Sequence, residues 1–479
     1  MPRILHWNRS NTNFKNSPFK TENKRKIIGL FLFLIYLSLD LFIFLTKIVA
    51  MRVIADIHNH SRFSRACSPQ LTLPNLEKWG EIKGVNLLTT ADFTHPTWIK
   101  ECEEQLTAVG NGFYRLKNSV KSVYFIFTTE LSFIYRKNEK TRRVHEIVLA
   151  PSIEAVKKLN KTLQDRGFNL KSDGRPILGL SDRNFLELVK SVDEKIEIIP
   201  AHIWTPWFSL FGSKSGFNSI KECFEDMAPY IFALETGISS DPPMNWRVSA
   251  LDPYILVSNS DSHSLKNIGR EANVFEIKEA DFSYDELIRI LKQKDINKFL
   301  YTIEFFPEEG RYHFDGHRDC GVSLEPKQTV KYKGICPKCK KPLTAGVSYR
   351  VEELADRELG YTPKNKPRYK RLIELDKIIA QSFEIKTRES RTVMDAYFKM
   401  VKILGNELFI LIDCPLAEMK SKGIDERIIQ GIDRVRREEL FIKPGYDGVY
   451  GEIGIFGKPE IKREIVRKKK TPRNQKSLF

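Results

Sequence analysis

Three short polar segments between residues 198 and 275 constrain this chain most, because each follows a short and largely apolar run. The segments are IIPAHIWTPWF, ALETG and LVSNSDSHS, and the runs are EIIP, YIFALE and PYILVSNS. Such runs are typical of buried strands that end in polar residues. In parallel α/β folds the strand ends carry the chemistry. We therefore expect His202, Glu235, Asp261 and His263 to converge where these strands end, and such a group of histidines and carboxylates suggests a metal site there.

The chain upstream of this region offers further ligands. In the strand RVIADIHNH, alternation places Asp56, His58 and His60 on one face. A helix is expected at 73–83 and a strand at 85–90, with Asp92 at its end and His95 just beyond. Two more strands follow, SVYFIFTTELSF and RVHEIVLAP.

These two strands carry one candidate each, since Glu130 ends the first and His145 lies within the second. The repeated order of strand, polar residue and helix predicts a parallel, barrel-like α/β domain.

The first fifty residues allow two interpretations. Residues 27–45 are apolar over the length of a membrane helix and follow Lys24, Arg25 and Lys26. Basic residues before a membrane helix would keep the N-terminus inside the cell and carry the rest of the chain outside. An outside location suits neither a reduced zinc site nor a nucleic-acid partner. Met51 opens MRVIADIHNHS, a natural start for a compact domain. We favour residues 1–50 as upstream sequence from a misassigned start, with a true membrane anchor as the alternative.

Composition points to the kind of partner. The chain has 479 residues, a net charge of +17 and a pI near 9.3. We expect two or three domains and an acidic partner, with nucleic acid first and an anionic membrane surface second. A solvated basic surface with no partner is the alternative. If Met51 is the true start, we expect a cytoplasmic, nucleoid-associated protein without stable membrane association.

The cysteines indicate a metal in a reducing compartment, because only Cys320, Cys336 and Cys339 of the seven cluster. HRDCG (317–321) and CPKCK (336–340) give H-x2-C and C-x2-C. His317 with the three clustered cysteines would hold one structural zinc. His313 is the alternative fourth ligand.

Together these motifs resemble a known superfamily. HNHS at 58–61, TAD at 90–92, TEL around Glu130, His145, PAH at 200–202 and SDSH at 260–263 resemble the motifs of the polymerase and histidinol phosphatase (PHP) superfamily. The resemblance implies a distorted (β/α)7 barrel with a trinuclear metal centre. Many members have a histidine after the second-motif aspartate. Here Phe93 follows Asp92, which leaves one ligand set, and the role of His95, open.

Longer segments resemble one branch, the endonuclease Q family, whose members nick DNA on the 5′ side of deaminated bases. They are HIWTPWFSLFGSKSGF, ALETGISSDPPMNWR and NSDSHSLKNIGREANVF, followed by the zinc-ribbon-like segment. The resemblance covers residues 51 to about 456. It implies an α/β fold: a PHP-type catalytic barrel at 51–300, a zinc-binding module at 301–359 and a helical DNA-binding region at 360–457. A basic tail, expected to be disordered, would follow at 458–479.

The expected metal ligands are histidines and carboxylates: His58, His60, Asp92, Glu130, His145, His202, Asp261 and His263. Of these, His58, His60, Glu130 and Asp261 are the expected catalytic residues. Glu130 is the candidate bridge between metals, and Glu235 is kept outside the ligand set. The mixture of nitrogen and oxygen ligands favours two or three ions of zinc, manganese or iron, with magnesium possible.

Two further segments carry candidate partner contacts. Reading a deaminated base in a duplex requires its extrusion, for which loop aromatics and cations are suited. The DNA-binding candidates are Trp207, Phe208, Lys214, Asn245, Arg247 and Arg270, although loop aromatics at a barrel mouth are as often loop core. Gln475, Leu478 and Phe479 resemble a peptide that docks on a sliding clamp.

The sequence therefore predicts a metal-dependent DNA repair endonuclease. It would hydrolyse the phosphodiester 5′ of deaminated bases (deoxyuridine, hypoxanthine, xanthine) or abasic sites and leave 3′-hydroxyl and 5′-phosphate ends. Two alternatives stay open, a PHP-type phosphoesterase acting on a small phosphomonoester and a non-catalytic DNA-binding adaptor.

Overall fold

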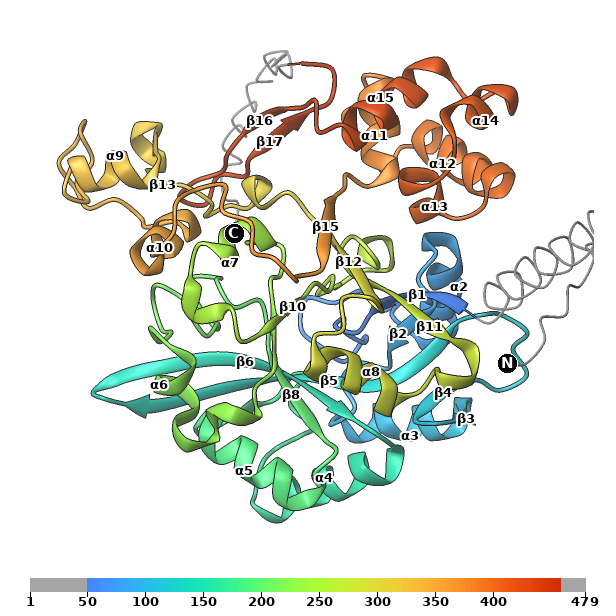
Figure 1. The fold of residues 1–479 in the computed structure, drawn as a ribbon, viewed down its shortest axis with the longest axis vertical. Coiled ribbons are helices and arrows are strands. Elements are labelled where there is room, and N and C mark those ends of the chain that lie inside the picture. Colours follow the sequence, from blue (N-terminus) through green and yellow to red (C-terminus); the bar gives the residue numbers. More distant parts are fainter. Residues whose placement is uncertain (1–49, 458–479) are drawn as a thin grey trace, which may run out of the picture. The chain divides into compact units, whose positions relative to one another are not determined.

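The computed structural model describes residues 50–457 (Figure 1). The extension at 1–49, the tail at 458–479 and the clamp-like peptide lie outside the described residues. Of the described residues, Arg52–Glu276 and 282–457 belong to one compact unit, and Ile277–Asp281 lie outside it. Within 50–457, no helix has the length and apolarity needed to cross a membrane.

An 11-stranded mixed sheet is the main element. Its strands are β1 (Ala50–Asp56), β2 (Leu87–Thr89), β3 (Leu106–Gly110), β4 (Phe113–Leu116), β5 (Tyr124–Lys137), β6 (Lys140–Ala150), β7 (Ile177–Leu178), β8 (Glu197–Pro200), β11 (Ala272–Lys278), β12 (Phe299–Glu304) and β15 (Arg368–Arg371). The main path runs β15-β12-β11-β1-β2-β5-β4-β3, with β6 and β7 paired to β5 and β8 paired to β6. β9 (Ala233–Glu235) and β10 (Ile255–Val257) form a separate parallel pair.

This pairing corrects the expectation of a parallel barrel in two respects. β1, β2 and β5 are parallel, but β5 and β6 form a long antiparallel hairpin, visible in Figure 1, and β6 and β8 are also antiparallel. Backbone pairing among the described residues does not close a barrel. Glu130 lies in the middle of β5 instead of at its end, because the strand continues to Lys137.

The helices around the sheet are α2 (Leu73–Lys83), α3 (Pro96–Gln105), α4 (Ile153–Asp165), α5 (Asp182–Val192), α6 (Ile220–Phe224), α7 (Pro242–Trp246) and α8 (Tyr284–Gln293). α2 has the bounds expected from the sequence and ends at Gly84, whose φ of 90° is left-handed. α4 shows how such helices are set in place. Ser152 caps it by accepting a hydrogen bond from the Ala155 amide, and α4 packs on β6 and on α5.

The remaining elements follow the sequence expectation closely. The zinc-ribbon-like segment contains β13 (Asp315–His317), β14 (Val322–Leu324), α9 (Pro326–Lys331) and α10 (Val347–Leu354). The expected C-terminal helices are confirmed as α11 (Leu375–Ser382), α12 (Arg391–Leu404), α13 (Glu407–Ile412), α14 (Leu416–Ser421) and α15 (Glu426–Arg436). Near the end of the described residues, β16 (Phe441–Lys443) pairs antiparallel with β17 (Glu452–Gly454), which lies in a glycine-rich segment.

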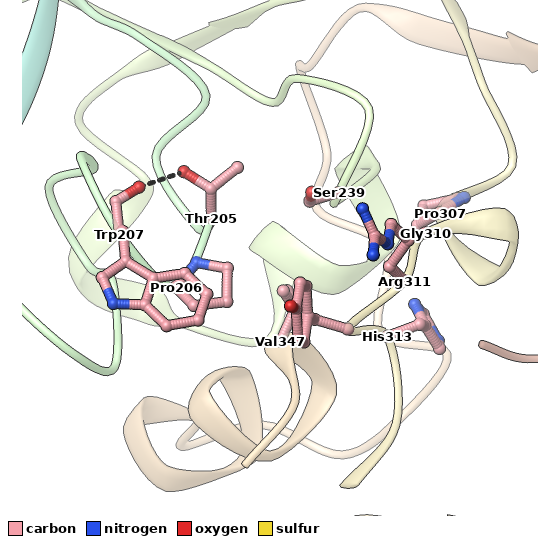
Figure 2. Close-up of a pocket in the computed structure, with 10 residues that line it drawn as sticks. Thr205, Pro206, Trp207, Ser239, Pro307, Gly310, Arg311, His313 and Val347 are labelled. Atoms are coloured by element: carbon pink, nitrogen blue, oxygen red, sulfur yellow. Dashed lines mark hydrogen bonds between the residues drawn. The ribbon is translucent and has the colours of Figure 1, made fainter. Parts of the chain in front are cut away.

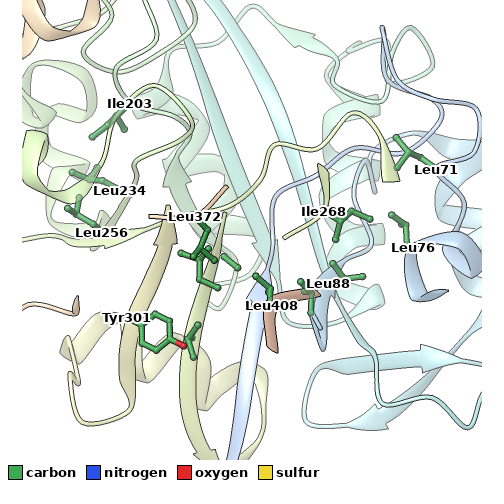
Figure 3. Close-up of a cluster of buried hydrophobic side chains, with 14 of the residues drawn as sticks. Leu71, Leu76, Leu88, Ile203, Leu234, Leu256, Ile268, Tyr301, Leu372 and Leu408 are labelled. Carbon is green, nitrogen blue, oxygen red and sulfur yellow. The ribbon is translucent and has the colours of Figure 1, made fainter. Parts of the chain in front are cut away.

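One apolar core joins the sheet to the C-terminal helices. Leu88 of β2, Ile268, Leu372 and Leu408 of α13 belong to the same buried cluster (Figure 3). Each fully buried leucine or isoleucine contributes about 1.5–3 kcal/mol from the removal of apolar surface from water. This shared core holds the loops after β1, β8 and β10 in fixed positions.

Candidate metal centre

Two groups of metal-binding side chains meet at the ends and centre of the sheet. The first is His58, His60, Glu130 and Asp261, and the second is Glu130, His145 and His202. Within each group the ligand atoms lie within 4.8 Å of one another. His58 and His60 lie just beyond the end of β1, and His202 and Asp261 follow β8 and β10. The structure therefore brings together six of the eight expected ligands.

Glu130 belongs to both groups. Its Oε1 lies 2.7 Å from Nδ1 of His145 and 3.0 Å from Nε2 of His202. Its Oε2 lies 3.2 Å from Nε2 of His60. Each oxygen of one buried carboxylate thus faces a different group, which is the geometry of a carboxylate that bridges two ions.

His58 shows that the residues fit a metal. Its Nδ1 lies 3.0 Å from Oε1 of Glu235, while its Nε2 is buried without a hydrogen-bond partner among the described residues. Glu235 also accepts hydrogen bonds from the His202 amide at 2.8 Å and from Nδ2 of Asn259 at 2.9 Å. An acceptor on one ring nitrogen and a free second nitrogen are typical of a metal-ligating histidine. Glu235 orients a ligand, in agreement with its place outside the expected ligand set.

Asp92 differs from the expectation, since it lies behind His60 and outside both groups. Its Oδ1 is 3.2 Å from Nδ1 of His60. Its Oδ2 accepts hydrogen bonds from the Ser61 amide at 2.7 Å and hydroxyl at 2.6 Å, and from the Ser64 hydroxyl at 2.9 Å. Both oxygens are occupied in this way, so Asp92 supports His60 as Glu235 supports His58.

The other two histidines of this region also lie outside the groups. Nδ1 of His263 donates to the Asp261 carbonyl at 2.9 Å, and its ring lies 4.5 Å from that of His60. The His95 ring stacks on Phe63 at 4.2 Å. The described residues contain no third group that includes either ring.

The backbone is strained at three of these positions. Asp92, His202 and Asp261 have φ values of 41°, 29° and 44°. Residues other than glycine rarely adopt this region, and such strain concentrates at functional sites. A Cβ on Gly237 would lie 2.4 Å from Cβ of His202, so only glycine fits there.

The charges suit metal binding. Burial raises the pKa of Glu130, but His145, Arg175 and His58 outweigh it and hold that pKa well below its usual range. Burial lowers the pKa of His145 to about 4 against the opposing effect of Glu130. Burial likewise lowers the pKa of His58, yet Glu235 and Glu130 raise it well above the usual value. At neutral pH Glu130 is therefore ionised and His145 neutral, the forms that bind a cation, whereas His58 must release a proton when it binds one.

Arg175 is a site residue that the sequence did not reveal. Its Nη1 lies 2.7 Å from Oε2 of Glu130. It comes from the loop between α4 and β7, where SDGRP reads only as a turn. In the sequence, the only acidic residue close to Arg175 is Asp173, and this offers little to single out Arg175.

The expected zinc ligands are brought together, with His317, Cys320, Cys336 and Cys339 as one group. Sγ of Cys339 lies 3.9 Å from Nε2 of His317. His313 is outside this group: its Nε2 is 3.1 Å from the Ser348 hydroxyl and its side chain is buried. The geometry therefore favours His317 over His313.

Of the six DNA-binding candidates, Trp207, Phe208 and Lys214 are exposed or lie beside the metal centre. Trp207 is 39% exposed and Lys214 is exposed. The Phe208 ring lies 4.7 Å from the His145 ring. Beside them, Thr205, Pro206 and Trp207 border a cavity of about 220 Å³ (Figure 2).

The other candidates hold the protein together. Asn245 was expected to contact DNA, but it is only 1% exposed and accepts a hydrogen bond from Nε1 of Trp204 at 2.7 Å. It therefore does not face solvent. Arg247 is paired with Glu352 at 2.6 Å. The Arg270 guanidinium donates to the Ser260 carbonyl at 2.8 and 3.0 Å.

A mixed α/β sheet whose strands present two His and carboxylate groups with a shared glutamate defines a candidate two-metal hydrolytic centre. Residues 374–439 match the MJ0043 C-terminal domain family. MJ0043 of Methanocaldococcus jannaschii is 31% identical over 254 residues, which are 53% of this chain and 31% of that protein. The chain thus spans about a third of MJ0043. An uncharacterized Bacillus subtilis protein, YqxK, is 30% identical over 420 residues, 84% of this chain and 99% of its own.

Two solved structures cover most of the chain. The lesion-specific endonuclease PfuEndoQ from Pyrococcus furiosus is 31% identical, with a TM-score of 0.74 over 87% of this chain and 98% of its own. Endonuclease Q in complex with a 27-mer duplex substrate, with an abasic lesion at the active site, is also 31% identical, with a TM-score of 0.73 over 87% of this chain and 99% of its own. This chain belongs to the endonuclease Q family.

Proposed function

We propose that the protein is a metal-dependent DNA repair endonuclease. It hydrolyses the phosphodiester 5′ of a deaminated base or an abasic site and leaves 3′-hydroxyl and 5′-phosphate ends. The carrying observation is Glu130, which presents one oxygen to each of two buried ligand groups. Similarity to PfuEndoQ and to the complex with an abasic lesion supports DNA as the substrate.

The position of each side chain indicates its role in the proposed reaction. His58, His60, Glu130 and Asp261 would hold one divalent ion, and Glu130 with His145 and His202 would hold a second. Zinc, manganese or iron suits this mixture of nitrogen and oxygen better than magnesium. When bound, such ions supply a water of lowered pKa, a clamp on the phosphate and positive charge for the leaving oxygen.

The remaining groups orient the ligands and face the substrate. Glu235 and Asp92 fix the rings of His58 and His60, so that Nε2 of each faces the site. Arg175 places a permanent positive charge beside Glu130. The side chain of Asp261 is 23% exposed, against 0–2% for His58, His60 and Glu130. Asp261 therefore marks the side from which a phosphodiester approaches.

The other parts of the chain would grip DNA and partners. We assign 51–300 to an open form of the PHP-type barrel, 301–359 to a module with one structural zinc, and 360–457 to DNA binding. The net charge of +17 supports an acidic partner. In the tail, Gln475, Leu478 and Phe479 form the proposed sliding-clamp peptide.

Incubation with Mn²⁺ and a duplex that contains a single deoxyuridine, hypoxanthine or abasic site tests this function. Both the full chain and the fragment from Met51 should produce a nick directly 5′ of the lesion. Asp261→Asn should abolish nicking while DNA binding persists, since it removes a ligand charge and no basic surface. Cleavage of a small phosphomonoester alone would favour the phosphatase. Binding without any cleavage would favour the adaptor.

A further inference from the structure

A basic pocket of about 570 Å³ lies at the start of β6, apart from the cavity in Figure 2. Its walls come from Lys140–Arg143 of β6, from the loop 212–218 and from α10. The cations that line it are Lys140, Arg142, Arg143, Lys214 and Arg350. Two carboxylates, Glu222 and Glu353, also line it.

These two carboxylates do not neutralise the pocket. Glu353 pairs with Nη1 of Arg350 at 2.6 Å, and Glu222 accepts a hydrogen bond from the Asn218 amide at 2.7 Å. Three other cations line the pocket, Lys140, Arg143 and Lys214. None of them forms an ion pair with a residue of the described range 50–457. Three positive charges therefore face the pocket without a carboxylate partner.

The floor of the pocket is rigid. Arg142 is 6% exposed, lies 4.2 Å from the Phe217 ring and donates to the Gly216 carbonyl. Its Nε is buried with no hydrogen-bond partner in the described part of the chain. Arg350 donates to the Phe217 carbonyl at 2.9 Å and to that of Phe211 at 3.0 Å. A cavity with a fixed arginine floor and an unsatisfied buried donor is suited to an anion.

The pocket is linked to the metal centre through β6. Arg143 and His145 are two residues apart and lie on the same face of the strand, at a spacing of about 7 Å. Phe208 lies between them, with its ring 4.7 Å from that of His145 and 5.9 Å from Cζ of Arg143. DNA carries one phosphate per strand for roughly every 3.4 Å of helix axis. Because the strand winds around that axis, neighbouring phosphates lie about 7 Å apart in space, so the offset from His145 to Arg143 corresponds to about one nucleotide.

We propose that this pocket binds backbone phosphates of the cleaved strand, about one nucleotide from the scissile bond, through Lys140, Arg143 and Lys214. The inference rests on the proposed function and adds where the strand is gripped next to the centre. Phosphate contacts fix the register of a protein on DNA without reading the sequence. The three residues are therefore positioning residues and not catalytic ones.

The test is the variant with Lys140→Gln, Arg143→Gln and Lys214→Gln, compared with wild type by anisotropy of a labelled lesion duplex at several salt concentrations. Each lost phosphate contact lowers the slope of log affinity against log salt by about 0.9, so a fall of about 2 to 3 is expected. Affinity at low salt should fall at least tenfold. The single-turnover nicking rate at saturating DNA should stay within about twofold of wild type, because no metal ligand is changed.

A matched variant removes the same charge elsewhere, with Lys78→Gln, Lys158→Gln and Lys161→Gln on α2 and α4. It should keep the wild-type slope, and thermal melting of both variants checks folding. An unchanged slope in the pocket variant would overturn the proposal, as would a lost nicking rate at unchanged affinity.

Titration with inorganic phosphate separates a free anion from the DNA backbone. If the pocket variant loses phosphate binding but keeps the wild-type slope on DNA, the pocket is a small-anion site and the proposal is wrong. A wild-type protein that binds the duplex but does not nick it would contradict the proposed function. The comparison of salt slopes would still show whether the pocket binds DNA.

Discussion

Oε1 of Glu235 lies 3.0 Å from Nδ1 of His58, and this contact leaves Nε2 of His58 facing the first ligand group. The same carboxylate accepts the amide hydrogen of His202, a ligand of the second group. One buried side chain outside both candidate ligand groups therefore orients a residue of each group.

Glu235→Gln should weaken metal binding more than it weakens folding. Glutamine can still accept a hydrogen bond from His58, but it lacks the negative charge that makes the imidazole a stronger ligand. Loss of such a supporting contact lowers metal affinity by about 10- to 100-fold. A Mn²⁺ titration of nicking should show this shift, with activity recovered at high Mn²⁺. An unchanged midpoint would contradict the role assigned to Glu235.

Arg175→Gln should slow catalysis without removing the ions. The guanidinium lies 2.7 Å from Oε2 of Glu130 and keeps that carboxylate ionised and in place. We expect single-turnover nicking to fall by about 10- to 100-fold at saturating Mn²⁺, with Arg175→Lys recovering part of it. Metal content measured by elemental analysis should stay near the wild-type value. Equal nicking rates in wild type, Arg175→Gln and Arg175→Lys would show that Arg175 does not contribute to catalysis.

Much of this centre could be predicted from the sequence, for a physical reason. His58, His60, His202 and Asp261 follow apolar strands, and the ends of neighbouring strands meet. These positions are local features of the chain.

Glu130 was expected as a ligand, but its place in the middle of β5 and the contact with Arg175 depend on contacts between distant segments. Glu130 pairs with Ile147 across the β5–β6 hairpin, which makes His145 its diagonal neighbour on the same face. Strand register of this kind is not encoded in spacing along the chain. Asp92 was expected as a ligand because it follows a strand and lies in the TAD motif, and only the positions of Ser61 and Ser64 show that one of its oxygens is occupied.

Replacing Cys336 and Cys339 with serine should remove one zinc per chain and lower stability or DNA binding, because metal binding and folding are coupled in such modules. His313→Gln is the matched control. His313 is buried against Ser348 and lies outside the ligand group, so this variant should keep its zinc. Zinc content by mass spectrometry under native conditions decides between them. Loss of zinc from the His313 variant would reverse the assignment of the fourth ligand.

Deletion of residues 475–479 should leave nicking of a short oligonucleotide unchanged but remove binding to the cognate sliding clamp. Gln475, Leu478 and Phe479 would supply the polar and apolar contacts, and ordering so few residues costs little entropy. A titration of clamp against the full and shortened chains measures the loss. Equal affinity of the two chains would show that these residues do not dock.

The last prediction concerns Glu304, a carboxyl at the end of β12 that belongs to neither ligand group. It is 0% exposed, its Oε2 accepts a hydrogen bond from the Thr236 hydroxyl at 3.1 Å, and its Oε1 has no partner within 50–457. Burial, with Asp241 nearby, raises its pKa from 4.5 to about 8. Between these two values the folded chain holds a proton that the unfolded chain has released.

The stability contributed by protonated Glu304 is therefore complete below about pH 4.5 and is lost as the pH rises toward 8. For one proton the slope reaches about 1.4 kcal/mol per pH unit. Glu304→Gln keeps the neutral form at every pH, so its free energy of unfolding relative to wild type should rise steadily across this window. Urea denaturation at intervals from pH 5 to about pH 8 measures the difference. Glu139→Gln, at an exposed turn, should run parallel to wild type. If Glu304→Gln also ran parallel, Glu304 would be ionised in the folded protein and its burial would be compensated by a group not yet identified.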